Sequence, residues 1–502
     1  MINKFENKIM KYLRFKLYYY TMGIHNFHKW IKQTFPSARE QVKNKILIDH
    51  VYIDLNFCLH LCAYNSKSFK MLFTKLNTFI QNILSKIEPT KSVTFASDGV
   101  APYAKLLLQR KRRLQMLRSD KYDLTETNKA VNPLYFTPGT IFMNQLSKNL
   151  ENTFNKIKKN LNIEINQYLD GVGEAEMKLF NHMNKILKEK PTEKHAIISN
   201  DADVVAIAMA NDNYQNINIV IKINNYEIIS LKKLLELMNP DKNNRNLDYS
   251  LLFLLMGNDY LPKLNYINIE NSLIIYNKII KNKPDFYLIK NQLNLQNLRY
   301  LLVKFINIIP KQWKNTFKLK TFDPKFYKNY LEGLLWCITD YNNCWCNNFE
   351  YMYKYKNGPH PLGLYYYLLL ENPTIEYPIK IKNNHEINNN IYGILTLPKK
   401  LHHILEKDIV DKTNLYQKEL KFLFEEELCN ECNRIHKEIS GHHKSLRCMI
   451  DMDYEEESPD NKDKMNILKD KIGNLNVIMR EHKSIHKDLT INQINNIINI
   501  FS

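Results

Sequence analysis

The sequence contains little glycine and no long apolar run. Twelve of the 502 residues are glycine, which is about 2% where roughly 7% is usual. Half of them lie in or beside the stretches discussed below: Gly23, Gly99, Gly139, Gly171, Gly173 and Gly257. Because glycine is scarce, we expect these positions to need backbone conformations that other residues seldom adopt. No apolar run reaches the length of a membrane span, so we expect no membrane partner.

The cysteines lack regular spacing, which argues against a disulfide framework. Eight cysteines at irregular intervals are typical of reduced thiols, and we expect an intracellular protein of the cytoplasm rather than the nucleus. Cys58 and Cys62 are interpreted as packed thiols. Residues 1–21 are aromatic but interrupted by basic residues, so a secretory signal is not expected. Met22 is a second candidate start of translation.

Cys429 and Cys432 form a C-x2-C pair. Other residue types that bind zinc follow in the sequence, at His436, His442, His443 and Cys448. A structural zinc site usually needs four such ligands in paired spacing. Because no second cysteine pair follows, we interpret this segment as free of metal and keep zinc as the alternative.

The charge of the chain is strongly positive. It has 71 Lys and Arg residues against 52 Asp and Glu residues, a net charge of +19 at pH 7. A surplus of this size predicts a polyanionic partner. A chain of 502 residues is longer than one ordinary domain, so two or three packed units are expected.

Two aspartates follow a short apolar run near the middle of the chain. Residues 196–198 have the composition of a buried parallel strand, and residues 204–208 that of a buried helix. Asp201 and Asp203 lie between them, at the edge of an α/β sheet where ligands bind. In the alternative interpretation these two carboxylates only cap the N-terminus of the helix.

Five further acids occupy similar junctions, at Asp54, Asp98, Glu174, Glu176 and Asp259. Close carboxylates disfavour one another's ionisation, so seven of them together need a positive partner. Oxygen ligands without paired Cys or His favour Mg²⁺ or Mn²⁺ over zinc. The pattern therefore predicts a divalent metal site built from all seven acids.

A basic helix is predicted from residue 104 to residue 118, directly after Asp98. One arc of about 100° on this helix carries Lys105, Gln109, Arg112 and Arg113. Stacked cations repel one another in an isolated helix, so the arrangement favours a bound anion such as phosphate. The alternative is a basic face that is merely solvated.

The pattern of apolar residues divides the chain into a part with alternating strands and helices and a mainly helical part. Strand-like and helical runs alternate from residue 46 to about 225, which predicts a parallel sheet covered on both faces. Residues 230–310 are mainly helical in period, and the tail after residue 455 is expected to be partly disordered. Trp30, Trp313 and Trp336 lie in apolar helical patterns and are predicted to be core residues.

Seven stretches resemble, in order and spacing, the XRN-type 5′→3′ exoribonucleases. They are MGIHNFHKWI at Met22, YIDLNFCLH at Tyr52, SDGVAPYAKLLLQRKRR at Ser97, FTPGTIFMNQL at Phe136, DGVGEAEMK at Asp170, SNDADVV at Ser199 and MGNDYLPKL at Met256. The resemblance covers roughly residues 22–355 and continues weakly to about residue 455.

The resemblance implies a PIN/flap-nuclease-like α/β core with a mainly parallel sheet, followed by a mainly helical second domain. The implied boundaries are an N-terminal extension at 1–21, the nuclease domain at 22–265, the helical domain at 266–455 and a tail at 456–502. It also implies two Mg²⁺ ions bound by the seven acids. The residues Lys105, Gln109, Arg112 and Arg113 would form a pocket for a 5′-monophosphate. His60 would stack on the first base of the RNA, with Trp345 as its partner.

The sequence therefore predicts a Mg²⁺-dependent 5′→3′ exoribonuclease. We expect it to act as a monomer on single-stranded RNA with a 5′-monophosphate. Two alternatives remain: a flap-endonuclease-like DNA nuclease, because the acids are shared with that family, and a catalytically inactive RNA-binding scaffold. The absence of a clear helix-hairpin-helix motif argues against the first, and the presence of all seven acids argues against the second.

Overall fold

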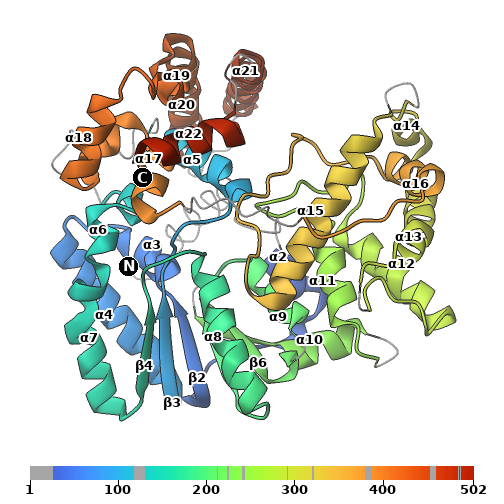
Figure 1. The fold of residues 1–502 in the computed structure, drawn as a ribbon, viewed down its shortest axis with the longest axis horizontal. Coiled ribbons are helices and arrows are strands. Elements are labelled where there is room, and N and C mark those ends of the chain that lie inside the picture. Colours follow the sequence, from blue (N-terminus) through green and yellow to red (C-terminus); the bar gives the residue numbers. More distant parts are fainter. Residues whose placement is uncertain are drawn as a thin grey trace.

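A computed structural model gives the fold of most of the chain (Figure 1). It describes residues 27–117, 131–211, 213–222, 225–239, 243–290, 292–318, 322–378, 387–452, 459–483, 486 and 488–501. The predicted extension at 1–21 lies outside these residues. Among the helices that the structure describes, none is long and apolar enough to cross a bilayer.

One seven-stranded sheet organises the first half of the chain, in the order β1-β7-β6-β5-β2-β3-β4. Its strands are β1 (Arg39–Gln41), β2 (Ile46–Asp54), β3 (Ile87–Ala96), β4 (Glu164–Tyr168), β5 (His195–Ile198), β6 (Ile217–Lys222) and β7 (Tyr226–Ser230). The neighbours from β6 to β4 are all parallel, and only β7 runs in the opposite direction, so it pairs antiparallel with both β6 and β1. The predicted, mainly parallel sheet is confirmed.

Successive side chains of each strand enter two different cores. On β2, Val51 and Ile53 pack with one apolar cluster, whereas Tyr52 packs with the other, as the alternation of strand side chains requires. The first cluster lies under α3 (Leu55–Ala63), α4 (Phe69–Lys86) and α7 (Leu146–Leu161). The second lies under α8 (Ala175–Glu189), α9 (Asp203–Ala210), α10 (Leu231–Met238) and α11 (Asn246–Leu254). Figure 1 shows α4 and α7 on one side of the strands and α8 on the other.

The second of these cores continues into a layer of helices with no strands of its own. It contains side chains of α2 (Phe27–Thr34), α12 (Ile269–Asn282), α13 (Leu295–Ile308), α15 (Pro324–Asn343) and α16 (Pro361–Leu370). Figure 1 shows α12, α13, α15 and α16 on the right of the molecule and α2 near its middle. The predicted helical character of residues 230–310 is confirmed, and the domain boundaries at 265 and 455 remain predictions.

A third apolar cluster joins the basic helix to the end of the chain. It combines α5 (Tyr103–Leu117) with α17 (Asn389–Thr396), α19 (Lys421–Leu428) and α22 (Ile491–Phe501). The long helices α20 (Asn430–Met452) and α21 (Pro459–Lys483) lie side by side at the top of Figure 1. The expectation of a partly disordered tail is wrong for its described residues, because they form α21 and α22, and α22 buries an isoleucine face.

The predictions for the tryptophans are confirmed for two of three. Trp30 and Trp336 are buried, with 7% and 1% of their surface exposed. Trp313 is 44% exposed and packs on the ring of Tyr266 at 5.0 Å, so its assignment to the core is wrong. The short helix α14 (Lys311–Lys314) that carries it is too short to bury one whole face. Cys58 and Cys62 are buried as predicted.

Candidate metal and phosphate site

Six of the seven acids lie at the carboxyl ends of neighbouring parallel strands, and Asp259 joins them from the loop after α11. Asp54 ends β2 and Asp98 follows β3. Asp201 follows β5, and Asp203 begins α9. Between β4 and α8 lie Glu174, at the N-cap of α8, and Glu176, in its first turn. Because the strands run parallel, these junctions meet at one edge of the sheet.

Side-chain hydrogen bonds connect the junctions. Asn56 donates from Nδ2 to Asp98 Oδ2 at 2.9 Å, and the backbone N–H of Ala175 donates to Asp98 Oδ1 at 3.0 Å. Asp98 therefore ties the start of α3 to the start of α8. In the same way, Ser199 Oγ donates to Asp54 Oδ2 at 3.0 Å, which joins the ends of β5 and β2.

Two glycines set the distance between Asp98 and Glu174. The N–H of Gly99 donates to Gly173 O at 2.9 Å, and the N–H of Gly173 donates to Val100 O at 2.8 Å. A Cβ on Gly99 would lie 1.7 Å from the carbonyl oxygen of Gly171, so no other residue fits there. Gly173 has φ of +100°, a conformation that favours glycine. Gly139, Gly171 and Gly257 also have positive φ, as expected of the scarce glycines, whereas Gly99 is required by the close approach of Gly171 and Gly23 lies outside the described residues.

Burial and mutual repulsion hold several of these carboxyls close to the neutral form. Burial, and then the neighbouring carboxylate of Asp98, raises the pKa of Asp54 to about 7. Burial followed by the charge of Asp201 raises the pKa of Asp203 well above its ordinary value. Burial and Glu174 do the same to the pKa of Glu176. A cluster with such pKa values is typical of a functional site.

Two cations from α5 reach into the cluster. Lys105 is buried, pairs with Glu174, and lies 3.2 Å from Asp259 Oδ2. Arg112 donates from both terminal nitrogens to Asp259, at 2.9 and 3.2 Å. Burial raises the pKa of Asp259, but the charges of Lys105 and Arg112 outweigh it and hold that pKa below the ordinary value. Asp259 is therefore held in its ionised form.

The next position of α5 leaves a donor unused. Arg113 is buried, and its Nε donates to Thr137 Oγ1 at 2.8 Å. Its guanidinium lies 5.9 Å from the ring centroid of Tyr392. Arg113 Nη1 is buried and finds no hydrogen-bond partner among the described residues, which is a costly state unless an anion completes it. Gln109 lies half-buried one turn earlier. A merely solvated basic face is excluded for Lys105 and Arg113, since both are buried.

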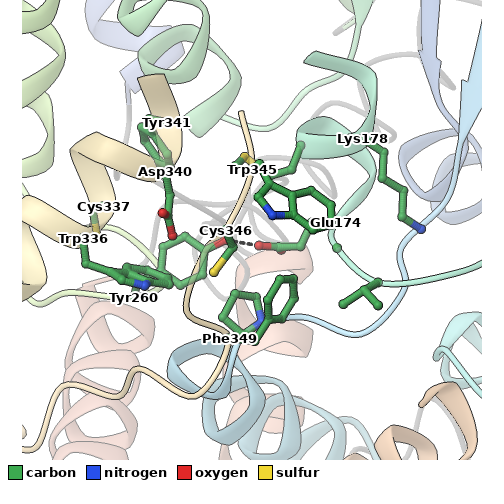
Figure 2. A pocket seen from close by; sticks show the side chains of 14 residues that line it. Glu174, Lys178, Tyr260, Trp336, Cys337, Asp340, Tyr341, Trp345, Cys346 and Phe349 are labelled. Atoms are coloured by element: carbon green, nitrogen blue, oxygen red, sulfur yellow. Dashed lines mark hydrogen bonds between the residues drawn. The ribbon is translucent and has the colours of Figure 1, made fainter. Parts of the chain in front are cut away.

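The two predicted stacking residues lie in different surroundings. Trp345 is 45% exposed and lines a cavity next to Glu174, Tyr260 and Phe349 (Figure 2). The cavity encloses about 30 Å³, far less than the roughly 300–1,000 Å³ of a ligand pocket. A base would therefore stack on the exposed side of Trp345, or the side chains that line the cavity would have to move to admit it. His60 is exposed on α3, packs edge-on against Phe136 at 5.3 Å, and is not among the described residues that line this cavity.

The acids fit divalent metal ions. Asp203 Oδ1 is buried without a hydrogen-bond partner among the described residues, as a coordinating oxygen would be. The described cations that pair with the seven acids are Lys105 and Arg112, and they pair only with Glu174 and Asp259. A donor set made only of carboxylates is the one that Mg²⁺ or Mn²⁺ prefers.

The segment that carries most of these acids is similar to known proteins. Residues 22–222, which carry six of the seven acids, match the family described as XRN 5'-3' exonuclease N-terminus. This segment belongs to the XRN nuclease family. The chain is 24% identical to human 5'-3' exoribonuclease 1 in an alignment of 379 residues, which covers 62% of this chain and 22% of that protein. A putative 5'-3' exonuclease of Acanthamoeba polyphaga mimivirus is 30% identical over 220 residues, 38% of this chain and 34% of that protein.

The chain spans only a part of these XRN relatives. It aligns with 22% of the human protein and 26% of 5'-3' exoribonuclease 1 of Schizosaccharomyces pombe. Among solved structures, the catalytic core of Rad2 in complex with DNA substrate aligns with 69% of this chain and 94% of its own, at 14% identity and a TM-score of 0.34. A match this weak supports no functional conclusion.

The structure adds residues to the XRN-type site that the sequence analysis missed. Tyr260 donates its hydroxyl to Glu174, and Asn56 and Ser199 hold Asp98 and Asp54. These three polar residues stand within three positions of a predicted acid, which was the available signal. Tyr392, beside Arg113, comes from a helix nearly 280 residues away, and no local pattern marks it.

Proposed function

We propose that the chain is a 5′→3′ exoribonuclease that hydrolyses single-stranded RNA bearing a 5′-monophosphate and releases mononucleotides. The observation that carries the proposal is the gathering of seven acids beside the cations of α5, six of them within the XRN-type segment. The names of the relatives support the same reaction. The described cysteines are free thiols, which supports an intracellular protein, and we propose that it is cytoplasmic and acts as a monomer.

The proposed chemistry divides between the acids and α5. The seven acids would hold two Mg²⁺ or Mn²⁺ ions, and such ions, when bound, activate water and stabilise the leaving oxygen of a phosphodiester. Lys105 and Arg112 lie at the acids and would attract the phosphate being cleaved. The free Nη1 of Arg113 and the amide of Gln109 would bind the terminal phosphate. His60 and Trp345 would stack on bases that enter the site.

A comparison of RNA ends tests the proposal. We expect 5′-monophosphate RNA to be degraded at least about tenfold faster than 5′-hydroxyl or 5′-triphosphate RNA, which corresponds to about 1.4 kcal/mol. Replacement of Arg112 and Arg113 together by alanine should remove this preference and leave slow decay of all ends. Initial rates on three RNAs that differ only at the 5′ end give the answer, and equal wild-type rates would refute the assignment of α5.

Three further tests distinguish an exoribonuclease from a flap endonuclease and from an inactive scaffold. Asp203→Ala should abolish turnover with Mg²⁺ while RNA binding survives, because binding depends on the basic surface. Cleavage of circular RNA or flap DNA as fast as linear RNA would favour a flap endonuclease. RNA binding without any turnover, in Mg²⁺ or Mn²⁺, would favour an inactive scaffold.

A further inference from the structure

Two cysteines and two histidines meet at the base of the α20–α21 hairpin, outside the acidic site. The ligand atoms of all four lie within 4.8 Å of one another: Cys429, Cys432, His482 and His486. Cys429 lies between α19 and α20 and Cys432 in the first turn of α20, and the histidines come from the end of α21 and the residues after it. In the sequence they form C-x2-C and H-x3-H pairs, which is the ligand spacing typical of structural zinc.

The distances match a four-coordinate ion. Cys429 Sγ lies 3.2 Å from His482 Nε2, and Cys432 Sγ lies 3.4 Å from His486 Nε2. Zinc bonds to sulfur of about 2.3 Å and to nitrogen of about 2.0–2.1 Å, at a tetrahedral angle, place such atoms about 3.6 Å apart. A small expansion would therefore seat the ion. The N–H of Cys432 also points to Cys429 Sγ at 3.5 Å, which would stabilise a thiolate there.

The hairpin has too little apolar contact to define its own geometry. Its separate cluster contains Cys432, Ile435, Ile439 and Met479, with Cys429 and Leu475 at the margin. Other apolar side chains of α21, such as Ile467 and Val477, are exposed. Helix pairs with so small a core usually need a covalent or metal link, and two of the four ligands already belong to this cluster.

The chain beyond His486 returns directly to the body of the protein. Asp488 pairs with Lys111 of α5 at 2.7 Å, and Leu489 is buried in the same cluster as α5 and α22. A link at the base of the hairpin would therefore also fix the approach of α22 to the basic helix.

We propose that one structural zinc ion fastens this base, bound by Cys429, Cys432, His482 and His486. Four protein ligands leave no open position, so the ion would support the fold rather than react with substrate. The mixed thiolate and imidazole set favours zinc over Mg²⁺. This replaces the interpretation of the segment as metal-free: the partners are not the nearby histidines His436, His442 and His443, but a pair about 50 residues further along.

Metal analysis of the full chain tests the proposal without any mutation. Protein purified without added zinc should contain one zinc per chain by elemental and native mass spectrometry. After removal of zinc with a chelator, Co²⁺ should restore one equivalent with the strong visible absorption of a tetrahedral site and a thiolate charge-transfer band. Amide exchange within α20 and α21 should accelerate in the zinc-free protein and return to its first rate when zinc is added back.

Variants then assign the ligands. The double variant Cys429→Ser with Cys432→Ser should lose the zinc, and His482→Cys should keep it, because cysteine is also a zinc ligand. The matched control is His442→Gln, on the same helix but outside the cluster, which should keep one zinc per chain. Full zinc retention by the double serine variant would overturn the proposal. So would failure of the wild-type chain to bind zinc or Co²⁺ stoichiometrically, or a Cys429–Cys432 disulfide in metal-free protein isolated without oxygen.

Discussion

The substitution Asp203→Asn separates the function of the acidic site from its stability. Asparagine keeps the shape of the side chain and removes its charge. Asp203 is buried, Oδ1 has no hydrogen-bond partner among the described residues, and Asp201 and Asp259 raise the energy of its ionised form. In EDTA we therefore expect the variant to unfold less readily than the wild type at pH 7.

The size of this effect has an upper bound. A buried carboxyl can always take up a proton instead of staying charged, so the free energy by which it destabilises the fold cannot exceed that of protonating an ordinary carboxyl. From the ordinary pKa of 3.8 to pH 7 this amounts to about 4 kcal/mol. Because the pKa of Asp203 is raised in the folded protein, this destabilisation is absent below about pH 4 and grows as the pH rises towards the folded pKa.

Magnesium should reverse the order of stability. An ion that binds only the folded wild type at 1,000 times its dissociation constant adds about 4.1 kcal/mol. A variant that has lost one ligand should gain less. The wild type would then match or exceed Asp203→Asn in Mg²⁺, and only the wild type would degrade RNA.

Urea unfolding at pH 5, 6, 7 and 8, in EDTA and in Mg²⁺, measures both effects. The control is Asp285→Asn, which changes an exposed carboxylate and should shift neither curve. The reasoning is refuted if Asp203→Asn is less stable than the wild type in EDTA at pH 7, because the carboxylate would then be a structural capping group. A gain in stability that does not depend on pH would refute the electrostatic origin.

Three further predictions concern other parts of the chain. His60→Ala should reduce the number of nucleotides removed per binding event on long RNA more than it weakens initial binding, since stacking contributes roughly 1–3 kcal/mol per base; the lengths of the partly degraded RNA measure this. Gly99→Ala should lower the unfolding free energy by more than about 2 kcal/mol, because its Cβ would collide with the carbonyl of Gly171; urea unfolding measures this, and an unchanged midpoint contradicts it. Burial lowers the pKa of His402 to about 4, so the unfolded chain binds a proton at this residue more readily than the folded chain. The free energy of unfolding of the wild type should therefore fall by up to about 3 kcal/mol as the pH drops from about 6.5 to 4. In His402→Gln, the free energy of unfolding should change less over the same pH range.

The sheet and the positions of the acids could be predicted because both depend on local pattern. Strands such as β2 and β5 are short apolar runs, and an acid directly after such a run must lie at the carboxyl edge of a parallel sheet. Asp54, Asp98 and Asp201 follow this rule. The same pattern includes Asp259, but the apolar run before it forms the helix α11 and not a strand, so the rule does not explain its place at the site.

Features that depend on distant partners could not be predicted. The pattern of α5 placed Lys105 and Arg113 on one face but could not show that the face is buried against other elements. Tyr392 approaches Arg113 from α17, and His482 approaches Cys429 from the end of α21. Neither contact leaves a trace at short spacing in the sequence. The prediction that Trp313 is a core residue was wrong for a related reason. An apolar helical pattern does not show whether another element covers the side chain.

Helix α5 connects the two functions of the site. Its Lys105 and Arg112 neutralise Glu174 and Asp259, while Arg113 offers an unused donor one residue further on. Since one rigid helix holds all three cations, an anion bound at Arg113 has a fixed position relative to the acids. Lys105 and Arg112 are the cations that a divalent ion would displace or share, so occupation of the acids and recognition of phosphate cannot be independent. Binding of Mg²⁺ should therefore change the affinity for a 5′-phosphate, and by linkage the phosphate should change the affinity for Mg²⁺ by the same factor.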